Sequence, residues 1–183
     1  MSMKLTGEQI LLRAIEPTDI DALYSWENNT DHWKVSNTQT PFSRHVLTQY
    51  IESAHLDIYS TKQLRLIIDE TQTDSHTSKN QKSIGCIDLF DFDPHHLRAG
   101  IGILIADKND RKKGHATEAL RLLIDYCFDF LNLKQVYCNI TVDNEPSILL
   151  FKKHGFAITG VKRSWIKEGN SFKDELLLQL IKN

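Results

Sequence analysis

The amino-acid sequence predicts an α/β (α+β) fold: a mixed, mainly antiparallel sheet of seven strands flanked by helices, in one domain spanning residues 1–183. Its segments follow one another as strand, two helices, three strands, helix, strand, helix and two strands, without an internal repeat. The chain is 40% hydrophobic and 25% charged, the composition of an ordinary globular protein. Its 183 residues suffice for a sizeable core.

Apolar runs predict three strands in the first half, at residues 9–14, 64–69 and 84–92. Residues 71–83 contain no apolar side chain, which predicts a solvated hairpin loop between the second and third strands.

Two helices are expected between the first two strands. Glu16-Pro17-Thr18-Asp19 opens the first, which ends before Asn28. Residues 43–59 predict the second, capped by Ser43, because their apolar positions lie three and four apart. Residues 31–42 have little periodicity and are expected to form a loop with at most one helical turn.

The stretch from Ala99 to Leu131 organises the rest of the chain. A buried strand starting at Arg98 runs into a charged loop, residues 107–113, that Gly114 closes. The helix that follows has one apolar stripe, formed by Ala116, Ala119, Leu120, Leu123, Ile124, Cys127, Phe128 and Leu131. A basic, glycine-containing loop at a helix N-terminus presents free N–H groups and the positive end of the helix dipole. This loop is therefore predicted to hold a pyrophosphate.

The last third of the chain completes the sheet. Residues 134–142 predict a fifth strand, and Asn144 and Pro146 open a short helix that ends at Gly155. Residues 156–165 and 172–181 predict a closing hairpin.

Composition excludes several classes of function. The net charge is −2, which argues against nucleic acid as a partner. No apolar run is long enough to span a bilayer and the N-terminus has no signal-peptide core, so no membrane partner is expected. The three cysteines lie in separate apolar segments without a C-x-x-C pair, which predicts neither a metal site nor disulfides. Together these features predict a cytoplasmic protein.

Two motifs carry a family resemblance. Residues 111–116, Arg-Lys-Lys-Gly-His-Ala, resemble the (Q/R)-x-x-G-x-(G/A) signature of the GCN5-related N-acetyltransferase (GNAT) family. Asn144, Ser147 and residues 150–156 resemble its second motif. The likeness covers essentially the whole chain.

Within that family, the chain looks most like the branch of bacterial spermidine/diamine acetyltransferases and ribosomal-protein N-terminal acetyltransferases. Three stretches carry this likeness: residues 12–19, Glu27-Asn28-Asn29 and residues 130–133.

The resemblance implies the acyl-CoA N-acyltransferase fold, acetyl-CoA as co-substrate and an amine acceptor as partner, and a homodimer as the assembly to test. Pyrophosphate would be held by backbone amides of Arg111, Lys112, Lys113, Gly114, His115, Ala116 and Thr117. Pantetheine would lie between the splayed central and fifth strands, beside Ile103, Leu104 and Ile105, and hydrogen-bond to Asn144. Lys152 or Lys113 would reach the adenosine 3′-phosphate.

The chain departs from the family pattern where the leaving thiolate needs a proton. Phe151 stands where the family usually has a tyrosine, and it is expected to pack beside the thioester. Ser147 is the candidate replacement acid, with capping or packing as its alternative role. Tyr137 and Cys138 are weaker candidates.

A second departure concerns the base. Gly100 stands where many members of this branch carry a glutamate. Asp88 is the next candidate, because a carboxylate between apolar residues can relay a proton through water; its alternative is a salt-bridged or solvent-facing strand residue. Asp91 and Glu70 follow. His115 is expected to be a surface residue or a phosphate neighbour rather than the base.

Acceptor binding is expected to involve Tyr24, Trp33 and Trp165, which could line an aromatic cleft, together with Asp88; core packing is the alternative for the tryptophans. Residues 28–40 contain a single acidic residue, which argues against a polyamine-specific pocket.

The sequence thus predicts an acetyl-CoA-dependent N-acetyltransferase that moves an acetyl group directly to a primary amine of a small molecule or a protein N-terminus. The alternative is a catalytically weak acyl-CoA-binding regulatory or sensor protein, motivated by Phe151 and Gly100.

Overall fold

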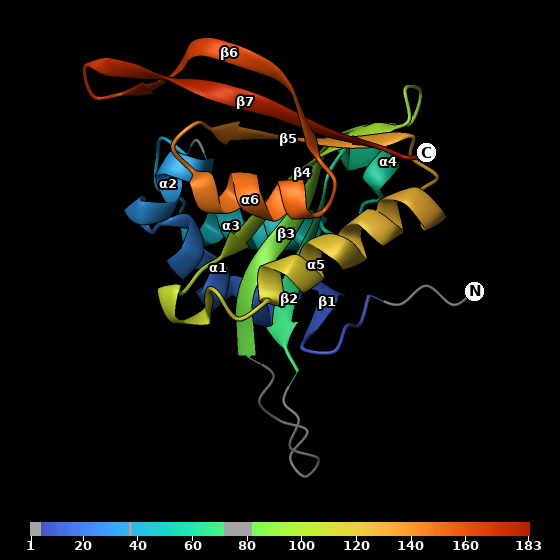
Figure 1. Ribbon diagram of the computed structural model, residues 1–183. Coiled ribbons are helices and arrows are strands. Elements are labelled where there is room, and N and C mark those ends of the chain that lie inside the picture. Colours follow the sequence, from blue (N-terminus) through green and yellow to red (C-terminus); the bar gives the residue numbers. More distant parts are fainter. Residues whose placement is uncertain (1–4, 37, 72–81) are drawn as a thin grey trace.

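In the computed structural model, which describes residues 5–36, 38–71 and 82–183, seven strands form one sheet in the order β1-β2-β3-β4-β5-β7-β6 (Figure 1). The strands are β1 (Ile10–Ala14), β2 (Leu64–Glu70), β3 (Lys82–Asp93), β4 (Arg98–Ile105), β5 (Gln135–Thr141), β6 (Ala157–Glu168) and β7 (Ser171–Ile181). All neighbouring strands in this sheet are antiparallel except β4 and β5. The predicted fold class is confirmed.

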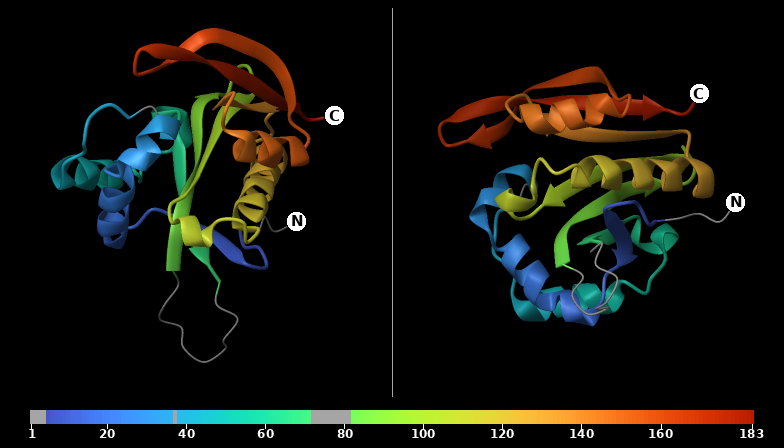
Figure 2. Two further views of the ribbon diagram at one scale, coloured as in Figure 1. Left: turned by 60° about the vertical axis from the view of Figure 1, so that its left-hand side comes forward. Right: turned by 60° about the horizontal axis from the view of Figure 1, so that its bottom comes forward.

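Helices cover both faces of the sheet (Figure 2). On one face lie α1 (Ile20–Glu27), α2 (Thr30–Ser36), α3 (Arg44–Ser53) and the short α4 (Ile58–Thr61), and on the other α5 (His115–Asp125) and α6 (Glu145–Lys153). Three shorter turns are η1 (Pro17–Asp19), η2 (Lys108–Asp110) and η3 (Tyr126–Phe130), the last a π-helical extension of α5.

The core has two parts because helices pack on both faces of the sheet. The larger packs the sheet against α5 and α6 and includes the predicted α5 stripe, of which Ala119, Leu120 and Leu123 are fully buried. The smaller lies under α1 and α3 and includes Leu23, Leu47, Ile15, Ile51, Ile67 and Cys86.

The sheet opens between β4 and β5, as the resemblance implied. These parallel strands pair only through Arg98–Gln135, Ala99–Val136 and Gly100–Tyr137. From Ile101 onward β4 has no β5 neighbour, so the backbone groups on that edge are free of sheet hydrogen bonds to β5.

The region from residue 28 to residue 61 differs from the prediction. The expected loop contains the seven-residue helix α2, because His32 and Trp33 anchor it through tertiary contacts that local periodicity does not reveal. The ring nitrogens of His32 lie 3.0 Å from the Trp26 carbonyl and 3.2 Å from that of Ala106. Ser43 caps α3 as predicted.

The predicted helix over residues 43–59 is interrupted. It ends at Ser53 and restarts as α4, where Asp57 accepts a hydrogen bond from the Ser60 N–H at 2.9 Å. The predicted loop 71–83 is wrong at its end, since Lys82 and Ser83 belong to β3; residues 72–81 lie outside the described part of the chain.

In the described ranges no helix is long and apolar enough to cross a membrane. The three cysteines are buried and unpaired. Across the same ranges, no group of three or more His, Cys, Asp or Glu side chains is arranged to hold a metal ion.

Candidate active site

A cavity of about 520 Å³ lies where β4 and β5 diverge, walled by α2 and the N-termini of α5 and α6. Eleven of the residues predicted to bind the donor line it: Ile103, Leu104, Ile105, Arg111, Lys112, Gly114, His115, Ala116, Thr117, Asn144 and Ser147. Residues separated by more than 40 positions thus meet in one place.

The loop before α5 has the geometry of an anion site. Gly114 has a φ of +94°, which favours glycine, and a Cβ there would lie 3.2 Å from Gln9 Oε1. The first helical hydrogen bond runs from the Glu118 N–H to the Gly114 carbonyl at 3.0 Å. The N–H groups of residues 115–117 are therefore without helical partners, at the positive end of the helix dipole.

Ion pairs and a backbone contact hold this loop in shape. Arg111 Nε donates to the Ile105 carbonyl at 3.1 Å. Asp110 is buried and pairs with Lys82 at 2.6 Å and with Lys113 at 3.1 Å. The hydrogen bond from Lys82 lowers the pKa of Asp110, so the carboxylate stays charged.

Three predicted donor-site residues do not line the cavity. Lys113 is turned toward Asp110, and Lys152 is exposed near the far end of α6. Phe151 is only 3% exposed and packs edge-to-face on Phe156 with ring centroids 5.0 Å apart. The expectation that Phe151 packs beside the thioester is therefore not supported, because its ring lies in the core.

His115 is buried, not a surface residue as one expectation had it, and lies on the cavity wall. Its Nε2 is 3.5 Å from Glu70 Oε1. Asn144 caps α6 as predicted, with its Oδ1 accepting from the Ser147 N–H at 3.4 Å.

Phe90 explains the missing carboxylate on β4. A Cβ on Gly100 would lie 2.2 Å from Phe90 Cε2, because the ring from the neighbouring strand β3 fills that place. A glutamate at position 100 does not fit unless Phe90 moves.

Asp88 is an ion-pair partner in the structure, as its alternative role had it, and not the carboxylate among apolar side chains that a base would need. Both of its oxygens accept from Arg65, at 2.8 Å and 2.9 Å. A third N–H of Arg65 donates to Glu27 at 2.5 Å. Burial opposes the guanidinium charge, but the Asp88 carboxylate outweighs it and holds the pKa of Arg65 above its ordinary value. Arg65 was not identified from the sequence. The only sign in the sequence of the Arg65–Asp88–Glu27 cluster was the alternation of charged and apolar residues along β2 and β3.

The aromatic residues expected at the acceptor site do not form one cleft. Tyr24 packs against Arg44, whose guanidinium carbon is 4.6 Å from the ring centroid. Trp33 Nε1 donates to the Glu27 carbonyl at 2.7 Å, and Trp165 on β6 is 60% exposed. Neither these three residues nor Asp88 lines the cavity.

A second cavity of about 410 Å³ adjoins the first and lies between α2, the start of α6 and the β6–β7 hairpin. We call it the mouth. Its carboxylates are paired: Glu168 lies 3.4 Å from Lys34, and Lys173 pairs with both Asp143 and Glu168. No sequence pattern linked these residues, because they come from segments far apart in the chain.

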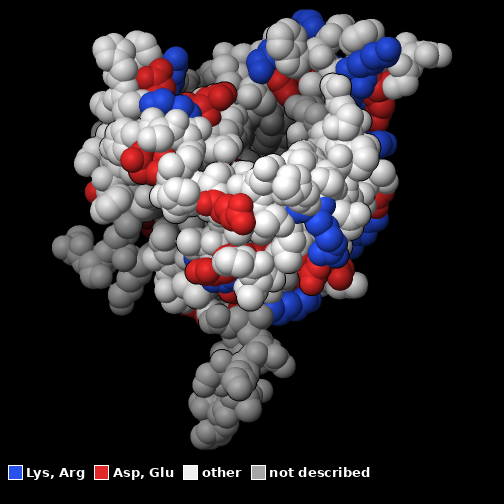
Figure 3. All heavy atoms as spheres, turned by 180° about the vertical axis from the view of Figure 1, so that it is seen from behind, with Lys and Arg blue, Asp and Glu red and all other residues white. Residues whose placement is uncertain are grey.

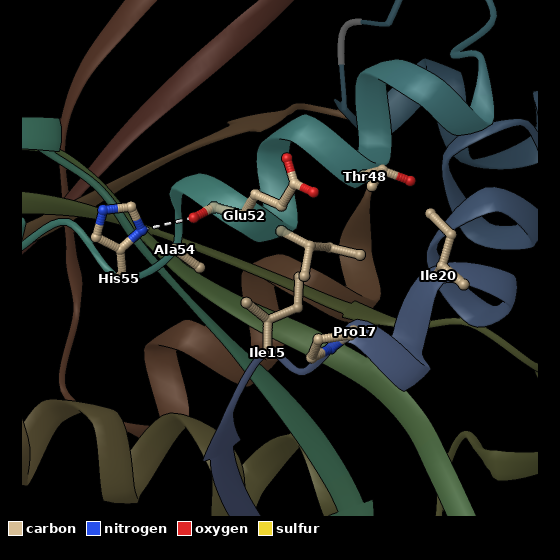
Figure 4. Close-up of a pocket in the computed structure, with 8 residues that line it drawn as sticks. Ile15, Pro17, Ile20, Thr48, Glu52, Ala54 and His55 are labelled. Carbon is tan, nitrogen blue, oxygen red and sulfur yellow. Dashed lines mark hydrogen bonds between the residues drawn. The ribbon is translucent and has the colours of Figure 1, made fainter.

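The face opposite α5 and α6 is hollowed near its upper edge in Figure 3, with side chains of both signs on the rim. A further cavity, of about 410 Å³, lies between α3 and the start of α1 (Figure 4). Its floor is apolar, and His55 Nδ1 lies 2.6 Å from the Glu52 carbonyl at its edge. None of its lining residues is a lysine or arginine, so it does not resemble the anion site.

The family model of the acetyltransferase (GNAT) domain matches residues 9–157. The chain belongs to this family. Its relatives include the spermidine N(1)-acetyltransferase of Vibrio cholerae, 24% identical over 157 residues, which cover 84% of this chain and 82% of the relative. An uncharacterized N-acetyltransferase, p20 of Bacillus licheniformis, is 29% identical over 182 residues, 97% of this chain and 96% of the relative.

Solved structures share the fold. The crystal structure of spermidine N-acetyltransferase from V. cholerae in complex with CoA and spermine has a TM-score of 0.82 and 21% identity, and the match covers 96% of each chain. This GNAT protein is therefore an acetyl-CoA-dependent N-acetyltransferase with the acyl-CoA N-acyltransferase fold. The likeness to ribosomal-protein N-terminal acetyltransferases stays a prediction.

Proposed function

We propose that this enzyme transfers the acetyl group directly from acetyl-CoA to a single primary amine, carried by a small molecule or by a protein N-terminus. The observation that carries the proposal is the cavity between the diverging strands, with the free helix N-terminus at one end and the unpaired edge of β4 along its side. A pyrophosphate and an extended amide chain need these two features.

For the donor, backbone N–H groups of residues 111–117 and the side chains of Arg111 and Lys112 would hold the pyrophosphate. Pantetheine amides would pair with the backbone of residues 103–105, which lacks a β5 partner. Lys113 and Lys152 lie outside the cavity, where the adenosine 3′-phosphate would be the group within their reach.

For the chemistry, the bound amine attacks the thioester carbon, and positioning supplies most of the rate enhancement. Free N–H groups of β4 beyond Gly100 would stabilise the oxyanion. Ser147 lines the cavity in the first turn of α6, which supports its assignment as the proton donor to the leaving thiolate.

The acceptor is proposed to carry one amine rather than several. A polyamine needs unpaired carboxylates, whereas the acids of the mouth are already paired: Asp143 and Glu168 with Lys173, and Asp31 with Lys108 at 3.2 Å. Tyr24, Trp33, Trp165 and the Asp88 ion pair remain proposed contacts for the rest of the acceptor.

The test is release of CoA from acetyl-CoA by the purified protein with a panel of mono-amines, amino acids, short peptides and polyamines. Turnover with a mono-amine or a peptide N-terminus supports the proposal. Calorimetric binding of CoA without turnover on any amine would instead identify the sensor alternative, which Phe151 and Gly100 favour.

We further propose a one-domain, self-associating, cytoplasmic enzyme. The three unpaired cysteines support a reducing compartment, and a dodecameric structure is known for the V. cholerae spermidine N-acetyltransferase. Size-exclusion chromatography with light scattering measures the number of chains in the assembly.

A further inference from the structure

The acceptor's ammonium must lose a proton before it attacks, and Gly100 supplies no carboxylate to take it. Another pair of proton-transferring groups stands where β4 and β5 part. Tyr137 is the last β5 residue in register with β4, directly opposite Gly100. Its hydroxyl donates to Asp91 Oδ2 at 3.0 Å.

Tyr137 lies on the face of the sheet that also carries Phe90. Its neighbours Val136 and Cys138 belong to the core under α5 and α6, so by strand alternation Tyr137 points to the opposite face. There its ring meets Phe90 edge-to-face, with centroids 5.9 Å apart. Because Gly100 has no side chain, the Phe90 ring can lie against β4 at this position. The glycine that replaces the expected glutamate therefore also allows Phe90 to pack against Tyr137.

Asp91 adopts an unusual backbone conformation. Its φ is +49°, in the left-handed region that residues other than glycine rarely adopt. The strain falls at a register shift between Phe90 and Asp93, a bulge that redirects the side chain. The Asp91 carboxylate on β3 thereby reaches across β4 to Tyr137 on β5, although β3 and β5 are not neighbours in the sheet.

We propose that Tyr137 accepts a proton from the acceptor's ammonium while it passes its own hydroxyl proton to Asp91. The inference rests on the proposed function. The neutral amine then forms the N–C bond as the C–S bond breaks; Ser147 gives its hydroxyl proton to the leaving thiolate and takes the second proton of the amine in return. Asp91 is exposed and returns its proton to water. Tyr137 is not among the residues that line the cavity; in this proposal it would contact the reacting amine from the closed end of the β4–β5 opening. Asp91 acts through Tyr137 as a positioning residue.

The surroundings favour a relay over a stable phenolate. Burial, followed by the hydrogen bond to Asp91, raises the pKa of Tyr137 to about 12, so the phenol is protonated when the acceptor binds. Arg98 on β4 opposes this shift, but it pairs with Asp93 at 3.3 Å.

Tyr137→Phe and Asp91→Asn test the relay, with Tyr126→Phe as the matched control because Tyr126 stacks on Phe130 in η3. For an aliphatic amine at neutral pH, we expect both relay variants to lose kcat/KM by about 100-fold or more. The loss should shrink as pH rises toward the acceptor's pKa, since the free amine needs no base. Calorimetric CoA binding and the control should match wild type.

An equal loss at every pH, or full activity in Tyr137→Phe, overturns the relay while leaving the proposed function in place. A wild-type protein without turnover on any amine overturns both.

Discussion

The donor and acceptor sides of this enzyme are built in different ways. The donor loop and the start of α5 are contiguous in sequence, and the structure keeps them together at the end of β4. The acceptor side gathers α1, α2, β3 and the β6–β7 hairpin, and its charges are paired across those segments. On the proposed assignment, a local motif would bind the donor, whereas long-range contacts would form the acceptor side. Substitutions on the two sides should therefore affect different measurements.

The largest expected effect is on the donor side. Gly114→Ala forces a residue with a Cβ into a φ of +94° and distorts the free N–H groups behind it. We expect CoA affinity to fall about 10-fold or more, which calorimetry measures, since each tenfold change corresponds to about 1.4 kcal/mol.

Gly169→Ala is the matched control for Gly114→Ala. Gly169 also has a positive φ, +59°, but a Cβ there meets nothing within 4 Å. It should lower stability by about 1–2 kcal/mol through the same backbone strain and leave CoA binding unchanged. Equal loss of CoA binding in both variants would contradict the anion-site assignment.

The next largest effect is on stability, at Gly100 and Phe90, which lie between the proposed donor and acceptor sides. Gly100→Ala places a Cβ against Phe90, and overpacking of this kind costs about 1–3 kcal/mol. Phe90→Ala in the same chain should restore much of that loss in a double-mutant cycle measured by urea unfolding. Gly102→Ala, whose Cβ would lie 3.8 Å from Phe90, is the tolerated control. Additive losses would show that Phe90 does not occupy the place of the missing side chain.

Phe151→Tyr separates the missing acid from core packing. Because Phe151 is buried against Phe156, a hydroxyl there has to be buried too, and an unpaired one costs about 1–3 kcal/mol. We expect a lower melting temperature and no gain in kcat. A faster enzyme would show that the ring reaches the thioester and that the missing acid limits the rate.

The smallest effect concerns the mouth. Lys173→Met frees Asp143 and leaves Glu168 paired only with Lys34. The KM for spermidine should therefore fall a few-fold, consistent with the modest strength of exposed ion pairs, about 0–1 kcal/mol. Lys153→Met on the exposed surface of α6 is the control. An unchanged KM in Lys173→Met would argue that polyamines do not approach through the mouth.

The same contrast explains what could be predicted from the sequence. The α5 stripe and the Asn144 cap follow from short-range periodicity and capping, and both are present. The opening between β4 and β5 was implied only by the family resemblance, and the structure shows it beginning after Gly100. The helix α2 was missed because buried contacts of His32 stabilise it. Asp88 was a candidate base because apolar residues flank it, and a salt-bridged strand residue was its alternative. The structure shows the ion pair, but Arg65, 23 positions away, carries no local sign that it will bind both carboxylate oxygens.

The central claim is that the enzyme acetylates an acceptor with one amine in preference to a polyamine, and a comparison of acceptors tests it most directly. In parallel reactions at saturating acetyl-CoA, kcat/KM is measured for CoA release with a mono-amine and with spermidine. We predict rapid release with the mono-amine and a lower kcat/KM for spermidine, because the proposed anion site would bind acetyl-CoA and the mouth offers few unpaired carboxylates. Binding of acetyl-CoA without release on either amine, or a clear preference for spermidine, would contradict it.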